Sequence, residues 1–174
     1  MNNTDHQILD RQLIPGLDLS FERIVDIPRE QIWKAWTQPQ HLMPWFCPLP
    51  WKVVECDIDL RPGGLFRTVM LSPEGQKFPN LGCYLEAIEN ERLTWTNALL
   101  PNFRPAPAAN EAQDTLNFYF TATIELAAHS TGTRYNATVR HGNEAAYQKH
   151  ASMGFKEGWG TALDQLVAYM KAQR

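Results

Sequence analysis

Hydrophobic and polar residues alternate along several segments of the chain, most clearly over residues 115–126. Apolar side chains occupy every second position of that segment: Leu116, Phe118, Phe120, Ala122, Ile124 and Leu126. Because successive side chains of a strand point to opposite faces, this period predicts a β-strand with one buried face. Similar patterns predict strands over residues 17–27, 51–60, 65–71, 76–88 and 92–98, and a last strand that ends at His141.

Most of these segments are joined by short connections rich in turn-forming residues. Residues 61–64 read Arg-Pro-Gly-Gly, and residues 72–75 read Ser-Pro-Glu-Gly. In the first of these turns Pro62 fixes its own φ, and Gly63 accepts the positive φ that a type II turn requires. Strands joined by such short turns pair with their neighbours in the antiparallel sense, so the sequence predicts an antiparallel sheet.

Three segments show the period of a helix instead. Pro28 suits the first turn of a short helix whose apolar stripe includes Trp33 and Trp36, and Pro39 begins a second short helix. Asn143 is a good N-cap for a long helix that runs to about Lys171, with apolar residues at steps of three and four.

Glycines inside the long helix carry a cost in helix stability. Gly154 and Gly158 lie one turn apart, which predicts a bend, a close approach to a strand or space left for a ligand. Of these, we expect close packing of the helix against a strand at both glycines.

The order of elements predicts one α+β domain of the helix-grip type over residues 17–174, after a loose segment over residues 1–16. That arrangement has a curved antiparallel sheet of about seven strands and two short helices. A long C-terminal helix packs over the sheet and encloses a cavity. A length of 174 residues fits one domain.

Charge and composition exclude several classes of function. The formal net charge is −3, with no run of like charges, so nucleic acid is not an expected partner. No stretch of 18 apolar residues occurs, and the first 16 residues lack the features of a signal peptide, so we expect a cytoplasmic protein without stable membrane association. The spacing of Cys47, Cys56 and Cys83 favours neither a disulfide framework nor a zinc site.

Three segments resemble a known family: RIVDIPREQIWKAWTQPQHLMPWF at residues 23–46, DLRPGGLFR at residues 59–67 and GFKEGWGTALDQL at residues 154–166. They are similar to the activator of heat-shock-protein ATPase homologue branch of the START-like, or birch-pollen-allergen-like (SRPBCC), superfamily. The resemblance covers roughly residues 17–172 and implies the helix-grip fold. It implies no single activity, because such relatives include lipid carriers, hormone receptors, polyketide cyclases and a chaperone regulator.

In such a domain the apolar faces of the strands and of the long helix would line the cavity. The predicted ligand-binding residues are Phe21, Phe66, Met70, Leu93, Trp95, Phe118, Phe120, Tyr135, Val139, His141, Phe155 and Trp159. The leading hypothesis is therefore a monomer or homodimer that binds or carries a small apolar molecule of aromatic or lipid-like character. The alternative is that the same side chains fill a solid core.

Two polar residues share the phase of the interior side chains. His141 is a candidate general acid or base, and Asn97 could fix a ligand carbonyl, as a cyclase, dehydratase or hydrolase would need. A histidine that only hydrogen-bonds the backbone is the alternative. A third hypothesis is a protein-interaction module related to the chaperone regulators, although the chain leaves no room for their additional domain.

Other candidate chemistry is weaker. Arg23 and Arg67 could bind a ligand carboxylate, but nearby acidic residues favour structural ion pairs. No metal-ligand spacing, nucleotide-binding loop or hydrolase motif occurs, so we expect neither a metal nor a cofactor. The proline-rich loop over residues 99–114 is predicted to be a lid over the cavity or a contact between two subunits.

Overall fold

A computed structural model describes residues 12–108 and 118–173 of the chain and contains one seven-stranded antiparallel sheet. The strands lie in the order β1-β9-β8-β5-β4-β3-β2. Their bounds are β1 Asp18–Val25, β2 Lys52–Ile58, β3 Leu65–Leu71, β4 Lys77–Ile88, β5 Arg92–Thr96, β8 Phe120–His129 and β9 Gly132–His141. The predicted α+β class and strand number are confirmed, whereas the predictions for residues 1–11 and 109–117 lie outside the described residues.

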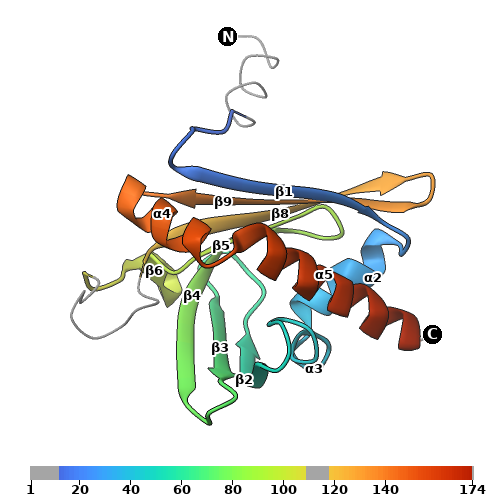
Figure 1. Ribbon diagram of the computed structural model, residues 1–174, viewed down its shortest axis with the longest axis horizontal. Helices are drawn as coiled ribbons and strands as arrows, with labels where there is room; N and C mark the ends of the chain where they lie inside the picture. Colours follow the sequence, from blue (N-terminus) through green and yellow to red (C-terminus); the bar gives the residue numbers. More distant parts are fainter. Residues whose placement is uncertain (1–11, 109–117, 174) are drawn as a thin grey trace.

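The sheet is strongly curved. In Figure 1, β1, β9 and β8 run across the view, whereas β4, β3 and β2 run down it. The two ends of the sheet therefore enclose a concave inner face, and the helices pack on that side. The turn at residues 61–64 takes the predicted form, since Gly63 has a φ of 80°.

Two short helices follow β1, as the prolines predict. Helix α2 spans Arg29–Thr37, with Pro28 immediately before it, and α3 spans Pro39–Leu42 with Pro39 at its first position. The buried residues of α2 are Ile32, Trp33, Ala35 and Trp36. The helix thus contributes two indole rings to the interior.

The single helix predicted from Asn143 to about Lys171 is wrong, because the structure contains two helices there. Helix α4 spans Glu144–Ser152, and α5 spans Phe155–Ala172. Gly154 lies between them with a φ of 76°, a left-handed conformation that interrupts the helical hydrogen bonds and that glycine adopts without strain. The predicted N-cap is confirmed, since the Asn143 side chain accepts a hydrogen bond from the Ala146 N–H.

The close packing preferred for Gly154 and Gly158 is also not what the structure shows. Gly154 makes the break, and a Cβ at Gly158 would meet nothing within 4 Å. The close approach occurs at Gly160, where a Cβ would lie 2.9 Å from Nη2 of Arg23. The strand β1 and the helix α5 come together at that position.

The core lies between the inner face of the sheet and the helices. Figure 1 shows α5 crossing this side of the sheet, with α2 and α3 beside its C-terminal half. The buried residues of α5 are Phe155, Gly160, Ala162, Leu163, Leu166 and Met170. The strands supply every second residue to this core, among them Leu93, Trp95, Ala122, Ile124, Leu126, Tyr135, Ala137 and Val139.

Part of the loop predicted over residues 99–114 is ordered as a small arm. It consists of β6 Leu99–Leu100, the 3-10 turn η1 Pro101–Phe103 and β7 Arg104–Pro105. The Asn102 N–H donates to the Gly63 carbonyl at 2.8 Å, so the arm contacts the turn before β3. Its role as a lid or as a subunit contact stays a prediction.

Candidate functional site

Most of the residues predicted to line a cavity lie on the inner face of the structure. Buried members of the set are Phe66, Leu93, Trp95, Phe118, Tyr135, Val139, His141 and Phe155, and half-buried members are Phe21, Met70, Phe120 and Trp159. Their rings pack in pairs, with Phe66 and Trp95 centroids 5.5 Å apart and Phe155 and Trp159 centroids 5.2 Å apart. Their role in ligand binding is not decided by burial alone.

Four further aromatic residues, which the sequence did not single out for binding, join this inner surface: Trp36, Trp45, Phe46 and Tyr84. The Trp36 centroid lies 4.9 Å from that of Trp45 and 5.2 Å from that of Trp95. The Tyr84 ring stacks on Phe66 at 5.2 Å. These rings come from α2, β3, β4, β5 and the segment after α3. We call Trp36, Trp45, Phe46, Phe66, Tyr84 and Trp95 the aromatic cluster.

Three polar atoms of the aromatic cluster are buried without a hydrogen-bond partner in the described part of the chain: Trp36 Nε1, Trp45 Nε1 and Tyr84 Oη. An indole N–H can only donate, and a neutral phenol can donate its proton. Burial, followed by the nearby Cys56, raises the pKa of Tyr84, so its hydroxyl keeps that proton. The cluster therefore presents three hydrogen-bond donors inside an apolar surround.

The Tyr135 hydroxyl lies beside this cluster. Burial raises the pKa of Tyr135, and an interaction of its hydroxyl with the Trp36 indole N–H, which falls short of hydrogen-bond geometry, is the lesser cause and lowers it. Tyr135 also meets Phe21 edge to face at 6.4 Å. It therefore extends the aromatic surface toward β1.

Charge is kept out of the interior. Among the described residues, no Asp, Glu, Lys or Arg side chain is buried. Burial raises the pKa of Cys47 to about 11 and, with Asp57 as a lesser cause, that of Cys56 to about 11, so both thiols stay neutral. An apolar and uncharged interior suits a neutral molecule, because an unpaired charge would be costly there.

Asn97 uses its side chain to hold the start of β8. Its Nδ2 donates to the Phe118 carbonyl at 2.9 Å, and its Oδ1 accepts from the Phe120 N–H at 2.8 Å. The amide thus continues the pairing of β5 with β8 by one residue. Its predicted role toward a ligand carbonyl would need hydrogen-bonding capacity beyond these two bonds.

His141 lies at the end of β9, buried as predicted, with protein partners on both ring nitrogens. Nδ1 lies 2.7 Å from the Leu17 carbonyl oxygen, and Nε2 lies 2.9 Å from Nδ1 of His150 in α4. His150 is therefore the side-chain neighbour of His141. The backbone hydrogen bond expected of a structural histidine is present.

Burial, and then the nearby His141, lowers the pKa of His150 to about 4, so this ring is neutral at physiological pH. The His150 ring is surrounded by Phe118, Phe120 and Phe155, with centroids 4.7, 5.6 and 5.4 Å away. Only the folded chain reveals this pair, because its members lie on a strand and on a helix.

The two arginines considered as carboxylate binders form ion pairs within the protein. Arg23 pairs with Asp164 of α5, and Arg67 pairs with Glu55 at 2.7 Å and Asp57 at 2.9 Å. Structural pairing, the preferred interpretation, accounts for both. Arg23 thereby ties β1 to α5.

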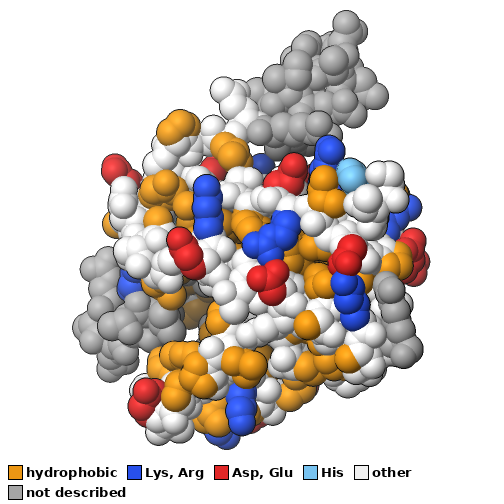
Figure 2. Space-filling view, turned by 45° about the vertical axis from the view of Figure 1, so that its right-hand side comes forward, with side chains coloured by type: hydrophobic (Ala, Val, Ile, Leu, Met, Phe, Trp, Pro, Cys, Tyr) orange, Lys and Arg blue, Asp and Glu red, His pale blue; other side chains and the backbone are white. Residues whose placement is uncertain are grey.

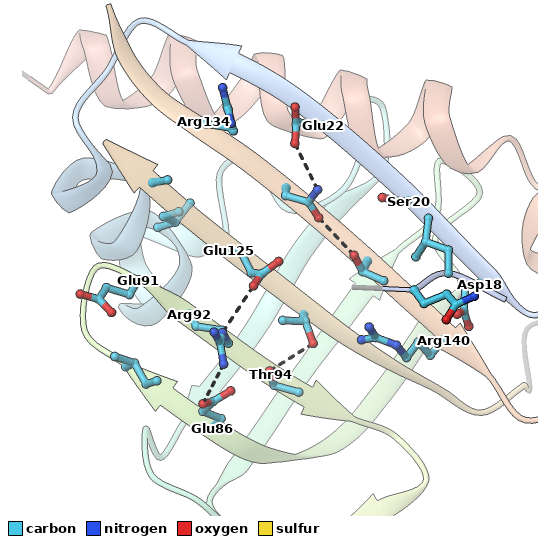
Figure 3. Close-up of a pocket in the computed structure, with 18 of the residues that line it drawn as sticks. Asp18, Ser20, Glu22, Glu86, Glu91, Arg92, Thr94, Glu125, Arg134 and Arg140 are labelled. Atoms are coloured by element: carbon cyan, nitrogen blue, oxygen red, sulfur yellow. Dashed lines mark hydrogen bonds and ion pairs between the residues drawn. The ribbon is translucent and has the colours of Figure 1, made fainter. Parts of the chain in front are cut away.

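The opposite face of the sheet carries a polar groove of about 1070 Å³ (Figure 3). Residues from β1, β9, β8, β5 and β4 line it, and most of them alternate along each strand with the core residues. Leu126 and His141, near the ends of the groove, line it as well. Arg92 lies between Glu86 and Glu125, at 3.4 and 3.6 Å, and Thr94 and Thr123 share a hydrogen bond of 3.2 Å. The polar groups of the groove thus mostly form ion pairs and hydrogen bonds with one another.

An apolar surface lies where β2, β3 and β4 extend beyond the helices. Figure 2 shows hydrophobic side chains gathered on the lower part of the molecule, where these strands lie. Trp51 packs on Phe78 at 5.3 Å, and both are half-buried, as is Met70 beside Phe78 in the register. This apolar edge continues the inner face outward.

The curved sheet and the helices that close its inner face define a helix-grip domain of the START-like class. The family model for "Activator of Hsp90 ATPase homolog 1-like protein" matches residues 26–171. The chain therefore belongs to this family, as the quoted sequence segments predicted. No similar protein was found among curated proteins.

Solved structures of similar proteins come from several bacteria. Protein NE0264 from Nitrosomonas europaea is 43% identical, with 92% of this chain and 98% of that chain covered and a TM-score of 0.85. Protein CV1439 from Chromobacterium violaceum is 25% identical over 90% of this chain and 98% of that chain, with a TM-score of 0.66. An AHSA1-like protein from Aeromonas hydrophila is 19% identical over 90% and 94%, with a TM-score of 0.64, which shows a shared fold alone.

Membrane-spanning helices and metal-binding groups are both absent from the described part of the chain. No helix there is long and apolar enough to cross a membrane. No group of three or more His, Cys, Asp or Glu side chains within residues 12–108 and 118–173 is placed to hold a metal ion.

Proposed function

We propose that this protein binds a small, neutral, mostly apolar molecule between the inner face of the sheet and α5, against the aromatic cluster. The observation that carries the proposal is the set of three unpaired donors, Trp36 Nε1, Trp45 Nε1 and Tyr84 Oη. A buried donor without a partner costs about 1–3 kcal/mol, so an interior that keeps three of them gains from an acceptor supplied by a ligand. The expected ligand has a flat apolar body and an accepting oxygen such as a carbonyl.

The alternative of a solid core makes a different use of the same residues. A polar atom has no role in filling space, and phenylalanine would serve in place of Tyr84 or the two indoles. Three donors among six neighbouring rings therefore support recognition over filling. The absence of buried charge in the described interior supports a neutral molecule.

The first test is native mass spectrometry of protein purified gently from its own cells, compared with the denatured mass. A stoichiometric excess mass is expected, because an enclosed apolar site releases its occupant slowly. Binding of indanone, a neutral ketone, and of indane, its hydrocarbon counterpart, is then measured by calorimetry. Tighter binding of indanone is expected, by roughly 2- to 12-fold if one net hydrogen bond is gained.

Tyr84→Phe is the sharpest variant, because it removes one unpaired oxygen and keeps the ring. It should reduce the preference for indanone and leave the free energy of unfolding without ligand unchanged or higher. Tyr119→Phe is the matched control, since Tyr119 alternates with the inward-facing Phe118 and Phe120. Failure of both probes to bind, together with no excess mass, would exclude this function and favour a protein-interaction module.

Catalysis through His141 and Asn97 stays a separate prediction. Both side chains have protein partners in this structure. If the reaction exists, His141→Ala should abolish turnover and leave ligand affinity within a few fold; equal loss of both would indicate binding alone.

A further inference from the structure

The histidine pair forms a second polar feature, at the end of the sheet where α4 begins. His141 Nδ1 and the His141 backbone N–H both lie close to the Leu17 carbonyl, at 2.7 and 3.1 Å. His141 Nε2 and His150 Nδ1 lie 2.9 Å apart. The two rings meet nearly at right angles, with an interplanar angle of 79°.

When both rings are neutral, these contacts fix their tautomers. A carbonyl oxygen can only accept, so His141 Nδ1 carries a proton and donates it to Leu17. His141 Nε2 is then the acceptor of its ring, and His150 Nδ1 must be the donor to it. The remaining nitrogen, His150 Nε2, consequently holds a lone pair and no proton.

This lone pair has no hydrogen-bond partner among the described residues, and it is not one of the fully buried polar atoms, so Nε2 reaches the surface although the His150 residue is only 8% exposed. The His150 ring has aromatic surroundings. Phe118, before β8, and Phe155, at the start of α5, both contact it, and Trp159 packs on the far side of Phe155. No carboxylate forms an ion pair with either ring in the part of the chain described. The pair is thus a single hydrogen-bond acceptor in an apolar setting.

We infer that His150 Nε2 accepts a hydrogen bond from the hydroxyl group of an apolar ligand, a phenol or an alcohol, and that His141 is a positioning residue that fixes the tautomer of His150. The inference rests on the proposed function and names the chemical group that would bind at this end of the interior. The aromatic cluster offers donors, whereas His150 offers an acceptor. A hydroxyl is the neutral group that an acceptor selects.

The pair is suited to binding a hydroxyl and not to removing its proton. The pKa of His150 is lowered to about 4, while an ordinary phenol has a pKa of about 10. A gap of about six pKa units keeps the proton on the ligand oxygen. The site therefore recognises an O–H group without ionising it.

The test compares naphthol with methylnaphthalene, which has the same ring system and a methyl group in place of the hydroxyl. Binding is measured by calorimetry and by the change in tryptophan fluorescence. Naphthol should bind more tightly to the unaltered protein, by roughly 2- to 12-fold for one neutral hydrogen bond. His150→Phe should abolish this preference and leave methylnaphthalene affinity within about twofold, while His129→Phe, at the last residue of β8, should change neither.

A spectroscopic measurement on the unaltered protein keeps the inference testable if His150→Phe does not fold. Imidazole nitrogen chemical shifts should show His150 protonated at Nδ1 alone, and naphthol should shift the Nε2 signal. His141→Phe should change the tautomer of His150 and reduce the naphthol preference, whereas a merely structural His141 would leave the tautomer unchanged.

The two hypotheses fail in different ways. If both probes bind with equal affinity and naphthol leaves the Nε2 signal unmoved, the role of His150 is wrong and the proposed function stands. If neither probe binds nor raises the melting temperature, both are wrong.

Discussion

The two faces of the sheet are built from the same strands and serve opposite chemical environments. On β8, Ala122 and Ile124 are buried in the core, whereas Thr123 and Glu125 line the outer groove. The outer polar groups bond to one another, as Arg92 does with Glu86 and Glu125. The inner face, by contrast, holds three buried donors without a partner. These buried donors on the inner face are the difference that indicates a ligand.

The largest effect should come from truncating the inner face. Ile124→Ala removes a side chain that is 1% exposed and should lower the free energy of unfolding by about 2–5 kcal/mol. Thr123→Ala, one residue earlier on the outer face, should cost about 1 kcal/mol or less through its bond to Thr94. Urea unfolding of both variants measures the difference. Equal losses would mean that the two faces do not divide the stability in this way.

A pH-dependent effect of intermediate size should come from His150. Its pKa is about 4 in the folded protein and about 6.5 in the unfolded chain, so the unfolded state takes up the proton first as the pH falls. Stability is fully present above about pH 6.5 and is lost as the pH falls toward 4. The loss should reach roughly 2 kcal/mol between pH 7 and about pH 5.

Unfolding measured across this pH range, with His150→Phe beside the unaltered protein, checks the assignment. The variant should lack most of the slope above pH 5, and His41, whose pKa is also lowered by burial and then by Lys34, should account for a remaining slope of the same sign. An unchanged slope would locate the proton uptake in another residue.

A smaller gain should come from the helix that covers the inner face. Gly158→Ala meets open space, so it should raise the free energy of unfolding by about 0.8–1.0 kcal/mol, the helix preference for Ala over Gly. Gly160→Ala is the control, since its Cβ would press on the Arg23 guanidinium and disturb the contact with β1. Thermal unfolding of the two variants should separate them; the reverse order would show that α5 packs differently.

The smallest effect should come from the outer ion pairs. Arg92→Gln removes the contacts to Glu86 and Glu125, both of which are partly exposed, and should cost about 1 kcal/mol or less. The difference from the unaltered protein should shrink at high salt, which screens exposed charges. A larger, salt-independent loss would show that the outer groove is a more important structural element than its exposure indicates.

Much of the fold could be predicted because its strands follow a strict period of two. Tyr135 and Val139 are predicted to face inward from the last strand, and both are buried. The continuous helix failed at Gly154, because a glycine between two amphipathic segments is compatible with a bend and with a break. Only the backbone conformation, set by how α4 and α5 each pack, distinguishes the two.

The candidate site was predicted less completely. The rings of Phe66 and Trp95 were named, but Trp36, Trp45 and Tyr84 were not, because periodicity marks a residue as buried without telling which neighbours it meets. Tyr84 could have been found as a tyrosine or tryptophan at an inward-facing position of a predicted strand. Which of these polar tips lack a partner is a property of packing and could not be read from spacing.

The sequence by itself determined which side of each strand is dry, where the turns fall and where the helix after Asn143 begins, because these depend on local periodicity, proline and glycine geometry and capping. The tertiary structure decided which distant residues meet. His141 and His150 lie nine positions apart but on a strand and on a helix, and their hydrogen bond exists only because α4 folds back over the end of β9. Hydrogen-bond pairing is a relation between side chains in space, so only the folded chain shows which groups are left free to bind.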